Sequence, residues 1–146
     1  MVFQLRLALV QDIPTMHAIR TSVRENVLSE GSTFGHDDYL PFLGANGEAW
    51  VGEIDGQMAG FAAIDRNNSS IWALFVSREF ESLGVGKALL NHLIGRAQQF
   101  EMTELHLTTT PRTRAEQFYI RQGWQFVGGA PNDEVSLRYL LNTDDK

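Results

Sequence analysis

Hydrophobic residues recur along this sequence at two spacings, which mark strands and helices in turn. The alternation across residues 5–9 predicts a first strand. A helix should follow, because Asp12 and Pro14 form a helix-start signal and apolar residues then recur every three or four positions. Residues 37–43 favour a short second helix, which Pro41 disturbs.

Three strand patterns occupy the middle of the chain. Residues 48–54 and 57–64 are joined by Asp55-Gly56, a dipeptide suited to the two positive φ angles of a tight hairpin. Residues 71–76 are apolar at every position, which is typical of a central strand covered on both faces. The sequence therefore predicts an antiparallel hairpin followed by a buried strand.

The spacing changes again in the second half of the chain. Residues 89–100 carry a broad apolar stripe at helical spacing, and residues 105–107 return to alternation. Thr113 and Glu116 have the spacing of a capping box that opens another helix. Two last strand patterns follow at residues 124–127 and 135–140.

This order of elements predicts an α+β fold around one mixed sheet. The sheet should be mostly antiparallel, with flanking helices and one parallel βαβ unit across residues 71–107, formed by a right-handed crossover. The length suits one compact domain over residues 1–141, and residues 142–146 have the composition of a solvated tail.

Charge and composition narrow the functional classes. The net charge is −6 with a pI near 5.1, and no stripe of Lys and Arg appears, which argues against a nucleic-acid partner. The chain has no cysteine, so thiolate nucleophiles, disulfides and Cys-ligated zinc are excluded. No apolar run approaches the roughly 18 residues that span a bilayer. We expect a cytoplasmic protein without a membrane partner or a metal site.

The strongest candidate for chemistry is the loop between the apolar strand and the long helix. Gly84 and Gly86 let the backbone approach a ligand, and the free amides of the helix start attract an anion such as pyrophosphate. An ordinary strand-to-helix turn is the alternative. A dinucleotide fingerprint would need glycine at Leu89, and a Walker A loop would need glycine at Glu81 and a hydroxyl at Ala88.

Two motifs in register resemble the GNAT N-acetyltransferase superfamily. The first is an apolar strand ending in valine that runs into a Q/R-x-x-G-x-G/A loop and a helix, here residues 76–90, V-S-R-E-F-E-S-L-G-V-G-K-A-L-L. The second is a downstream pattern N-x-x-A-x-x-F-Y followed by G-F. Its counterparts in this chain are Ala115, Phe118, Tyr119, Gly123 and Trp124. The resemblance extends over essentially the whole chain in the order of elements.

The chain departs from the family pattern at two positions. Glu81 stands where Gln or Arg is usual, which puts a carboxylate near a polyanionic ligand. Arg112 stands where Asn is usual. The cations of Arg78, Lys87 and Arg112 are candidates to offset the charge of Glu81.

The resemblance implies acetyl-CoA as the acetyl donor and assigns roles to residues. The Leu74 amide would polarise the thioester carbonyl. Tyr119 would be the general acid, since a phenol of pKa about 10 can protonate a thiolate whose conjugate acid has a pKa of roughly 8.5. The cofactor contacts that it implies are Leu74, Phe75, Val76, Ser82, Leu83, Gly84, Gly86, Lys87, Arg112, Ala115 and Phe118.

The general base and the acceptor contacts are less defined. Family members often carry a Glu where this chain has Ser70, so a water relay or another base is needed. The candidate bases are Glu25, His106, Glu53 and Tyr39. The residues expected to face the acceptor are Glu25, Asn26, Tyr39 and Trp72.

Together these features predict transfer of the acetyl group to a primary amine of a small molecule, by direct attack within a ternary complex. Acidic side chains in the region between the first helix and residue 47 favour a cationic acceptor. The alternatives are a non-catalytic acyl-CoA sensor or interaction module, transfer of another acyl group or to a hydroxyl, and an enzyme acting on a protein or peptide N-terminus. A homodimer is left open.

Overall fold

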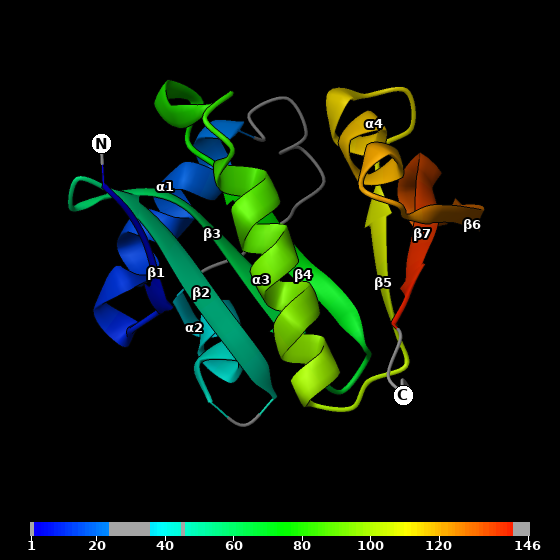
Figure 1. The fold of residues 1–146 in the computed structure, drawn as a ribbon, viewed down its shortest axis with the longest axis horizontal. Helices are drawn as coiled ribbons and strands as arrows, with labels where there is room; N and C mark the ends of the chain where they lie inside the picture. The colour runs from blue at the N-terminus through cyan, green and yellow to red at the C-terminus, as the bar shows by residue number, and fades with distance from the viewer. Residues whose placement is uncertain (1, 24–35, 45, 142–146) are drawn as a thin grey trace.

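The computed structural model describes residues 2–23, 36–44 and 46–141. Its strands form one sheet of seven in the order β1-β2-β3-β4-β5-β7-β6 (Figure 1). Within these residues β4 and β5 are the one pair of parallel neighbours, so the mixed, mostly antiparallel sheet predicted from the sequence is confirmed. The strands are β1 (Phe3–Leu7), β2 (Gly47–Ile54), β3 (Gln57–Asp65), β4 (Ser70–Val76), β5 (Glu104–Thr109), β6 (Gln125–Ala130) and β7 (Glu134–Leu140).

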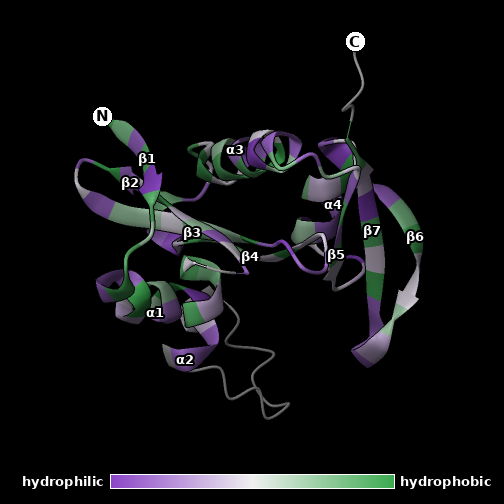
Figure 2. Cartoon of the chain, turned by 90° about the horizontal axis from the view of Figure 1, so that it is seen from below, coloured by the Kyte–Doolittle hydropathy of each residue, from purple (hydrophilic) through white to green (hydrophobic). Residues whose placement is uncertain are grey.

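Helices cover the two faces of the sheet (Figure 2). The helices are α1 (Ile13–Val23), α2 (His36–Tyr39), α3 (Val85–Gln99) and α4 (Arg114–Arg121), with short 3-10 turns at Val10–Asp12, Leu40–Leu43, Arg78–Phe80 and Pro131–Asp133. A first core cluster packs α3 and α4 on one face, and a second packs α1 and α2 on the other. Ile71 of β4 belongs to the first cluster and Ala73 to the second, which confirms that this strand is covered on both faces.

The predicted hairpin is confirmed in both its turn and its pairing. Asp55 and Gly56 have φ angles of 51° and 84°, as a two-residue turn of this kind requires. β2 and β3 pair from Ile54↔Gln57 to Gly47↔Asp65, with one bulge at Ala59, where the register shifts between Gly52 and Glu53. The turn thus aligns β2 with β3, the strand that pairs with β4 in the centre of the sheet.

The capping box of α4 is also confirmed, with one shift. The Thr113 hydroxyl accepts a hydrogen bond from the Glu116 N–H at 3.2 Å. The Glu116 carboxylate accepts from the Arg112 N–H at 2.6 Å, one residue before the cap. This second bond fixes Arg112 at a φ of 60°, the left-handed conformation that starts the helix beside the end of β5.

α1 begins at Ile13, between Asp12 and Pro14, which confirms the predicted helix start, but the Asp12 side chain bonds elsewhere. Asp12 does not cap that helix, because it ends the 3-10 turn Val10–Asp12. Its carboxylate accepts from the Leu9 N–H at 2.7 Å and binds Arg6 at 2.8 Å. Arg6 of β1 also binds Glu53 of β2. Arg6 therefore joins both Asp12, immediately before α1, and β2 to the first strand.

The remaining predictions concern membrane spans, the C-terminal tail, the domain boundary, the cellular location and the oligomeric state. None of the helices within the described residues has the length and hydropathy to cross a bilayer. The tail at residues 142–146 lies outside the described part of the chain. The single-domain boundary, the cytoplasmic location and the homodimer stay predictions.

Candidate active site

The open edge of β4 is the main feature of the candidate site. β4 and β5 pair only at Ser70↔His106 among the described residues, supported by the His106 N–H donating to the Ser69 C=O at 2.8 Å. Beyond this contact the two strands separate (Figure 1). A β-bulge accompanies the separation: Ala73 pairs with Ala63 and Ile71 with Ile64, which leaves Trp72 as the extra residue.

Two residues of β4 direct their main-chain groups toward this open edge. The Ser77 N–H donates to the Ala59 C=O at 2.7 Å, so this pair is a hydrogen-bonded pair of the antiparallel ladder. Because such pairs alternate, the N–H and C=O of Leu74 and Val76 point away from β3. They face the side from which β5 has separated, where an added strand could form hydrogen bonds with them.

The glycine loop ends at the N-terminus of α3. Gly84 is the N-cap and has a φ of 85°, in the left-handed region that favours glycine, and Ser82 has a φ of 68°. The Ala88 N–H donates to the Gly84 C=O at 3.0 Å, so the amides of the three preceding helical residues have no acceptor one turn back. These amides and the helix dipole form a site for an anion.

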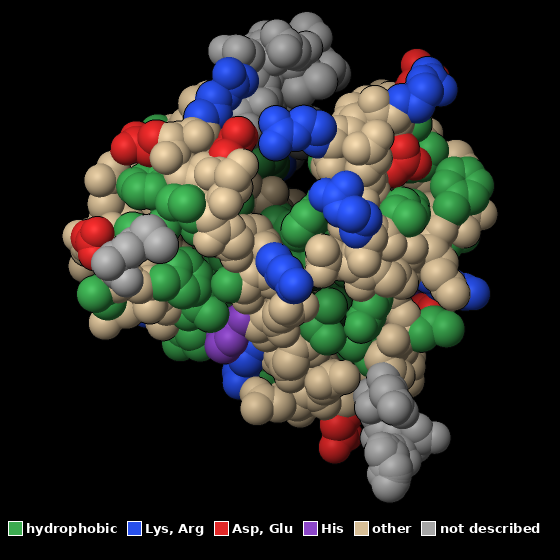
Figure 3. All heavy atoms as spheres, turned by 45° about the horizontal axis from the view of Figure 1, so that its top comes forward, with side chains coloured by type: hydrophobic (Ala, Val, Ile, Leu, Met, Phe, Trp, Pro, Cys, Tyr) green, Lys and Arg blue, Asp and Glu red, His purple; other side chains and the backbone are tan. Residues whose placement is uncertain are grey.

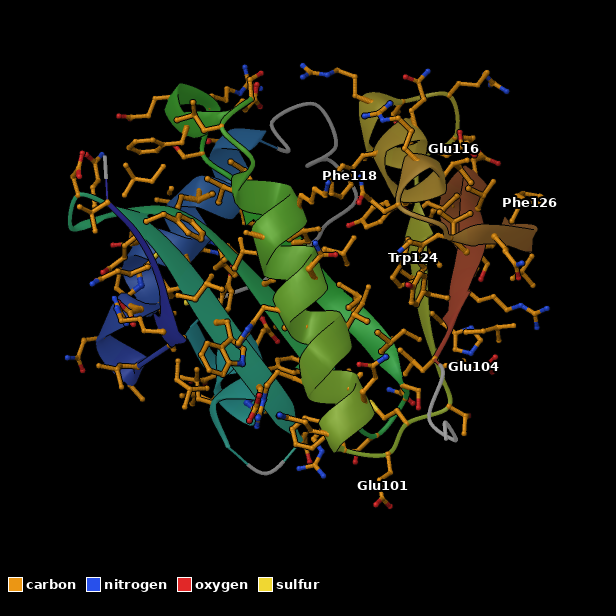
Figure 4. The ribbon with its side chains drawn as sticks, viewed as in Figure 1. Glu101, Glu104, Glu116, Phe118, Trp124 and Phe126 are labelled. Carbon is orange, nitrogen blue, oxygen red and sulfur yellow. The ribbon has the colours of Figure 1, made fainter. Side chains whose placement is uncertain are left out.

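Gly86 joins the loop to the open edge. A Cβ at this position would lie 3.5 Å from Val76 Cγ2 and 3.8 Å from Phe118 Cζ. Phe118 extends from α4 into the space between α4 and α3 (Figure 4). The first turn of α3, the end of β4 and the aromatic side of α4 therefore meet at one point.

Charges surround this meeting point. Figure 3 shows a hollow in the surface with Lys and Arg side chains about its rim. Glu81, the departure from the family pattern, lies 4.0 Å from the guanidinium of Arg114 on α4, and both side chains are well exposed. Lys87 and Arg112 are exposed as well. Arg114, which the sequence analysis did not single out, is thus the cation that the structure brings to Glu81.

Tyr119 is buried on the inner face of α4. Only 8% of it is exposed, and its ring meets those of Phe118 and Trp124 edge-on at 5.2 and 5.6 Å. Burial raises the pKa of the Tyr119 phenol far above its ordinary value. The hydroxyl therefore keeps its proton across the physiological range. Ala115, one turn before Tyr119, is exposed.

The residues predicted to contact the acceptor differ in their location. Glu25 and Asn26 lie outside the described residues. Tyr39 is 1% exposed, and its hydroxyl bonds the His17 Nδ1 at 2.9 Å, so it belongs to the second core cluster. Trp72 is half-buried and meets Tyr39 edge-on at 5.3 Å. Trp72 is therefore the residue of this set that the structure places next to the open edge of β4.

The candidate bases also differ in their surroundings. Glu53 binds Arg6 at 3.0 Å on the far side of the sheet, at the β1–β2 edge. His106 lies where β4 and β5 meet, and its Nε2 contacts the Glu104 carboxylate at 2.9 Å. Of the candidates within the described residues, His106 is the one on a strand that borders the separation.

A shallow cavity of about 270 Å³ lies elsewhere, between α3 and β2. Two of its lining residues bind the same carboxylate: Arg96 contacts Glu48 at 2.6 Å, and the Trp50 Nε1–H donates to Glu48 at 2.9 Å. Burial, reinforced by the Arg96 cation, lowers the pKa of His92. This cavity is lined by none of the residues of the glycine loop or of β4.

Comparison with known proteins identifies the class. The model of the acetyltransferase (GNAT) family matches residues 15–124. The chain belongs to this family and is an acetyl-CoA-dependent N-acetyltransferase, as the sequence resemblance predicted. It is 32% identical over 120 residues to the peptidyl-lysine N-acetyltransferase YiaC of Escherichia coli, covering 74% of this chain and 79% of that protein.

Solved structures agree on the fold. The ribosomal-protein-S18-alanine N-acetyltransferase of Escherichia coli superposes with a TM-score of 0.78 at 15% identity, over 99% of this chain and 97% of that one. The PaiA N-acetyltransferase of Thermoplasma acidophilum, solved in complex with coenzyme A, superposes with a TM-score of 0.77 at 14% identity, over 96% and 99%. The predicted GNAT fold is thereby confirmed.

Proposed function

We propose that the chain transfers the acetyl group of acetyl-CoA directly to the primary amine of a lysine side chain in a protein or peptide. The observation that carries the transfer step is the edge of β4 beyond Ser70, which pairs with no strand of the described residues and leads to the glycine loop. Leu74 and Val76 offer main-chain groups there, and Gly86 leaves the adjoining space unfilled. An extended pantetheine arm can pair with such an edge as an added strand does.

The chain's own groups fit the charged end of acetyl-CoA. In this proposal the amides from Ser82 to Lys87, excepting Val85, donate to the pyrophosphate at the start of α3. Lys87, Arg112 and Arg114 are exposed cations on α3, before α4 and on α4, and Arg114 reduces the repulsion from Glu81. Phe118 and Ala115 border the pantetheine from α4, and Phe75 contributes from β4.

The reaction proceeds through one attack without a covalent enzyme intermediate. The amine nitrogen forms a bond to the thioester carbonyl carbon while the Leu74 N–H stabilises the negative charge on its oxygen. The C–S bond then breaks, and the Tyr119 hydroxyl gives its proton to the departing thiolate. The attacking nitrogen loses one proton to water, and His106 beside Glu104 is the candidate base for this step among the described residues. An equivalent proton returns to the Tyr119 phenolate, which restores the acid for the next turnover.

The acceptor is the finer part of the proposal. The similarity to YiaC, a peptidyl-lysine N-acetyltransferase by name, supports a lysine side chain. A small-molecule amine is the second candidate, which the exposed Asp37 and Asp38 at the start of α2 favour because they attract a cation. Both acceptors present the same nucleophile, a primary amine on a flexible alkyl chain.

A panel of acceptors at equal amine concentration separates these candidates. The panel contains a lysine peptide with a blocked N-terminus, the same peptide with acetyl-lysine and a free N-terminus, and a diamine. We expect release of CoA thiol with the first peptide at a kcat/KM at least about tenfold above the others, a difference of about 1.4 kcal/mol. Preference for the diamine would support the second candidate, and preference for the free N-terminus would contradict both.

A further inference from the structure

Arg20 is a charged residue that lies almost entirely inside the protein. It is in the last turn of α1 and is 7% exposed. Burial of a guanidinium is costly unless its neighbours compensate. Two of these neighbours are aromatic rings of β4, whose centroids lie 4.8 Å (Trp72) and 5.0 Å (Phe75) from the guanidinium carbon. Both distances are those of cation–π contacts.

The same cluster holds Trp72 from further sides. Phe42 stacks on its indole at 4.3 Å with an interplanar angle of 23°, and Tyr39 meets it edge-on at 5.3 Å. Trp72 is the extra residue of the β4 bulge, so regular strand pairing does not set the direction of its side chain. The packing of Phe42, Tyr39 and Arg20 sets it instead.

The position of Trp72 matters for the direction from which an acceptor arrives. On the face of α3 and α4, the surroundings of the β4 edge are filled by Leu74, Val76, Phe118 and Tyr119 of the first core cluster. The opposite face of the same strand carries Trp72 and Phe75. Among the described residues, an amine that attacks a thioester held at Leu74 from this opposite face would approach along these two rings.

We infer that Arg20 is a positioning residue for the acceptor, which fixes the rings of Trp72 and Phe75 as the wall along which the amine approaches. The inference rests on the proposed function and extends it to a residue that does not touch the reacting atoms. Arg20 lies on α1, and its ring contacts are on the face of β4 opposite the one that Leu74, Val76 and α3 share, so we expect it to act on the acceptor more than on acetyl-CoA.

The test compares Arg20→Met with Arg20→Lys, using the best acceptor of the wild-type chain. Arg20→Met should raise the KM for the acceptor about tenfold, as expected for the loss of desolvated cation–π contacts, and leave the KM for acetyl-CoA within about twofold. Arg20→Lys keeps the charge without the planar group, so it should restore part of the acceptor KM.

Two further variants make the result specific. Arg66→Met removes a cation that lies 3.8 Å from the Phe100 ring at the other end of α3, and should leave both KM values unchanged. Phe42→Leu removes the stacked ring without removing a charge, and should raise the acceptor KM. If Arg20→Met does not fold, Phe42→Leu and Arg20→Lys together test the inference.

The outcomes separate the inference from the proposed function. A wild-type acceptor KM in Arg20→Met, or in both Arg20→Lys and Phe42→Leu, would overturn the inference while transfer itself stands. An equal rise in the KM for acetyl-CoA in Arg20→Met would also overturn the inference, because Arg20 would then have a general structural role. A wild-type chain that turns over no amine would overturn the proposed function and the inference with it.

Discussion

Replacement of Gly84 by Val is expected to abolish the binding of acetyl-CoA while the chain still folds. Gly84 has a φ of 85°, which valine adopts only with strain of about 1–3 kcal/mol, and a Cβ there would meet no atom within 4 Å. The loop would therefore turn away and misdirect the amides at the start of α3. In the wild-type chain, ligand at a hundredfold excess over its Kd should stabilise folding by about 2.7 kcal/mol, and this thermal shift should vanish in the variant.

Gly56→Val is the matched control for this experiment. Gly56 has nearly the same φ, 84°, and also has open space around its Cβ position, but it lies in the hairpin between β2 and β3. Both variants should lower the melting temperature by a similar amount, and only Gly84→Val should lose the shift with acetyl-CoA. An undiminished shift in Gly84→Val, or an equal loss in Gly56→Val, would remove the loop from the cofactor site.

Tyr119→Phe should lower kcat about ten- to a thousandfold, the usual contribution of a positioned acid, with little change in the affinity for acetyl-CoA. The ring packing of Tyr119 against Phe118 and Trp124 survives the change, because only the hydroxyl is lost. The buried phenol has a raised pKa, so it holds its proton at higher pH than a free tyrosine. The kcat of the wild-type chain should therefore not fall through loss of this acid below about pH 10.

Tyr139→Phe provides the comparison for the hydroxyl. Tyr139 of β7 also packs against Trp124, at 5.5 Å, so it shares this aromatic neighbour with Tyr119 but is not on the same helix. Its replacement should leave kcat within about twofold of the wild type. Equal rates for the Tyr119→Phe and wild-type chains from neutral to alkaline pH would assign Tyr119 to the core alone.

Features that depend on neighbouring residues were predictable from the sequence. The Asp55-Gly56 turn and the Thr113–Glu116 cap are decided by φ preferences and by bonds that span three residues, so both appear where expected. The glycine loop was predictable for the same reason, because the left-handed conformation of the N-cap at Gly84 favours glycine. These local signals were sufficient to order the elements and to find the fold.

Features that depend on distant parts of the chain were not predictable in this way. The β4 bulge arises from the pairing of Ala73 with Ala63 and of Ile71 with Ile64, which no spacing within residues 71–76 reveals. The burial of Arg20 was likewise not predictable, since a cation in the last turn of a helix usually faces solvent. Tyr39 was expected to line the acceptor site, and its hydroxyl is engaged by His17 from another helix.

Direct transfer is tested most sharply by following three products in one incubation of the wild-type chain with acetyl-CoA and a lysine peptide. CoA thiol, peptide mass and enzyme mass are measured together, with a parallel sample that lacks the peptide. The account predicts that thiol appears in step with singly acetylated peptide, that omission of the peptide stops its release, and that the enzyme mass stays unchanged. Tight binding of acetyl-CoA without thiol release from any amine, or an enzyme that gains an acetyl group before the peptide does, would contradict it.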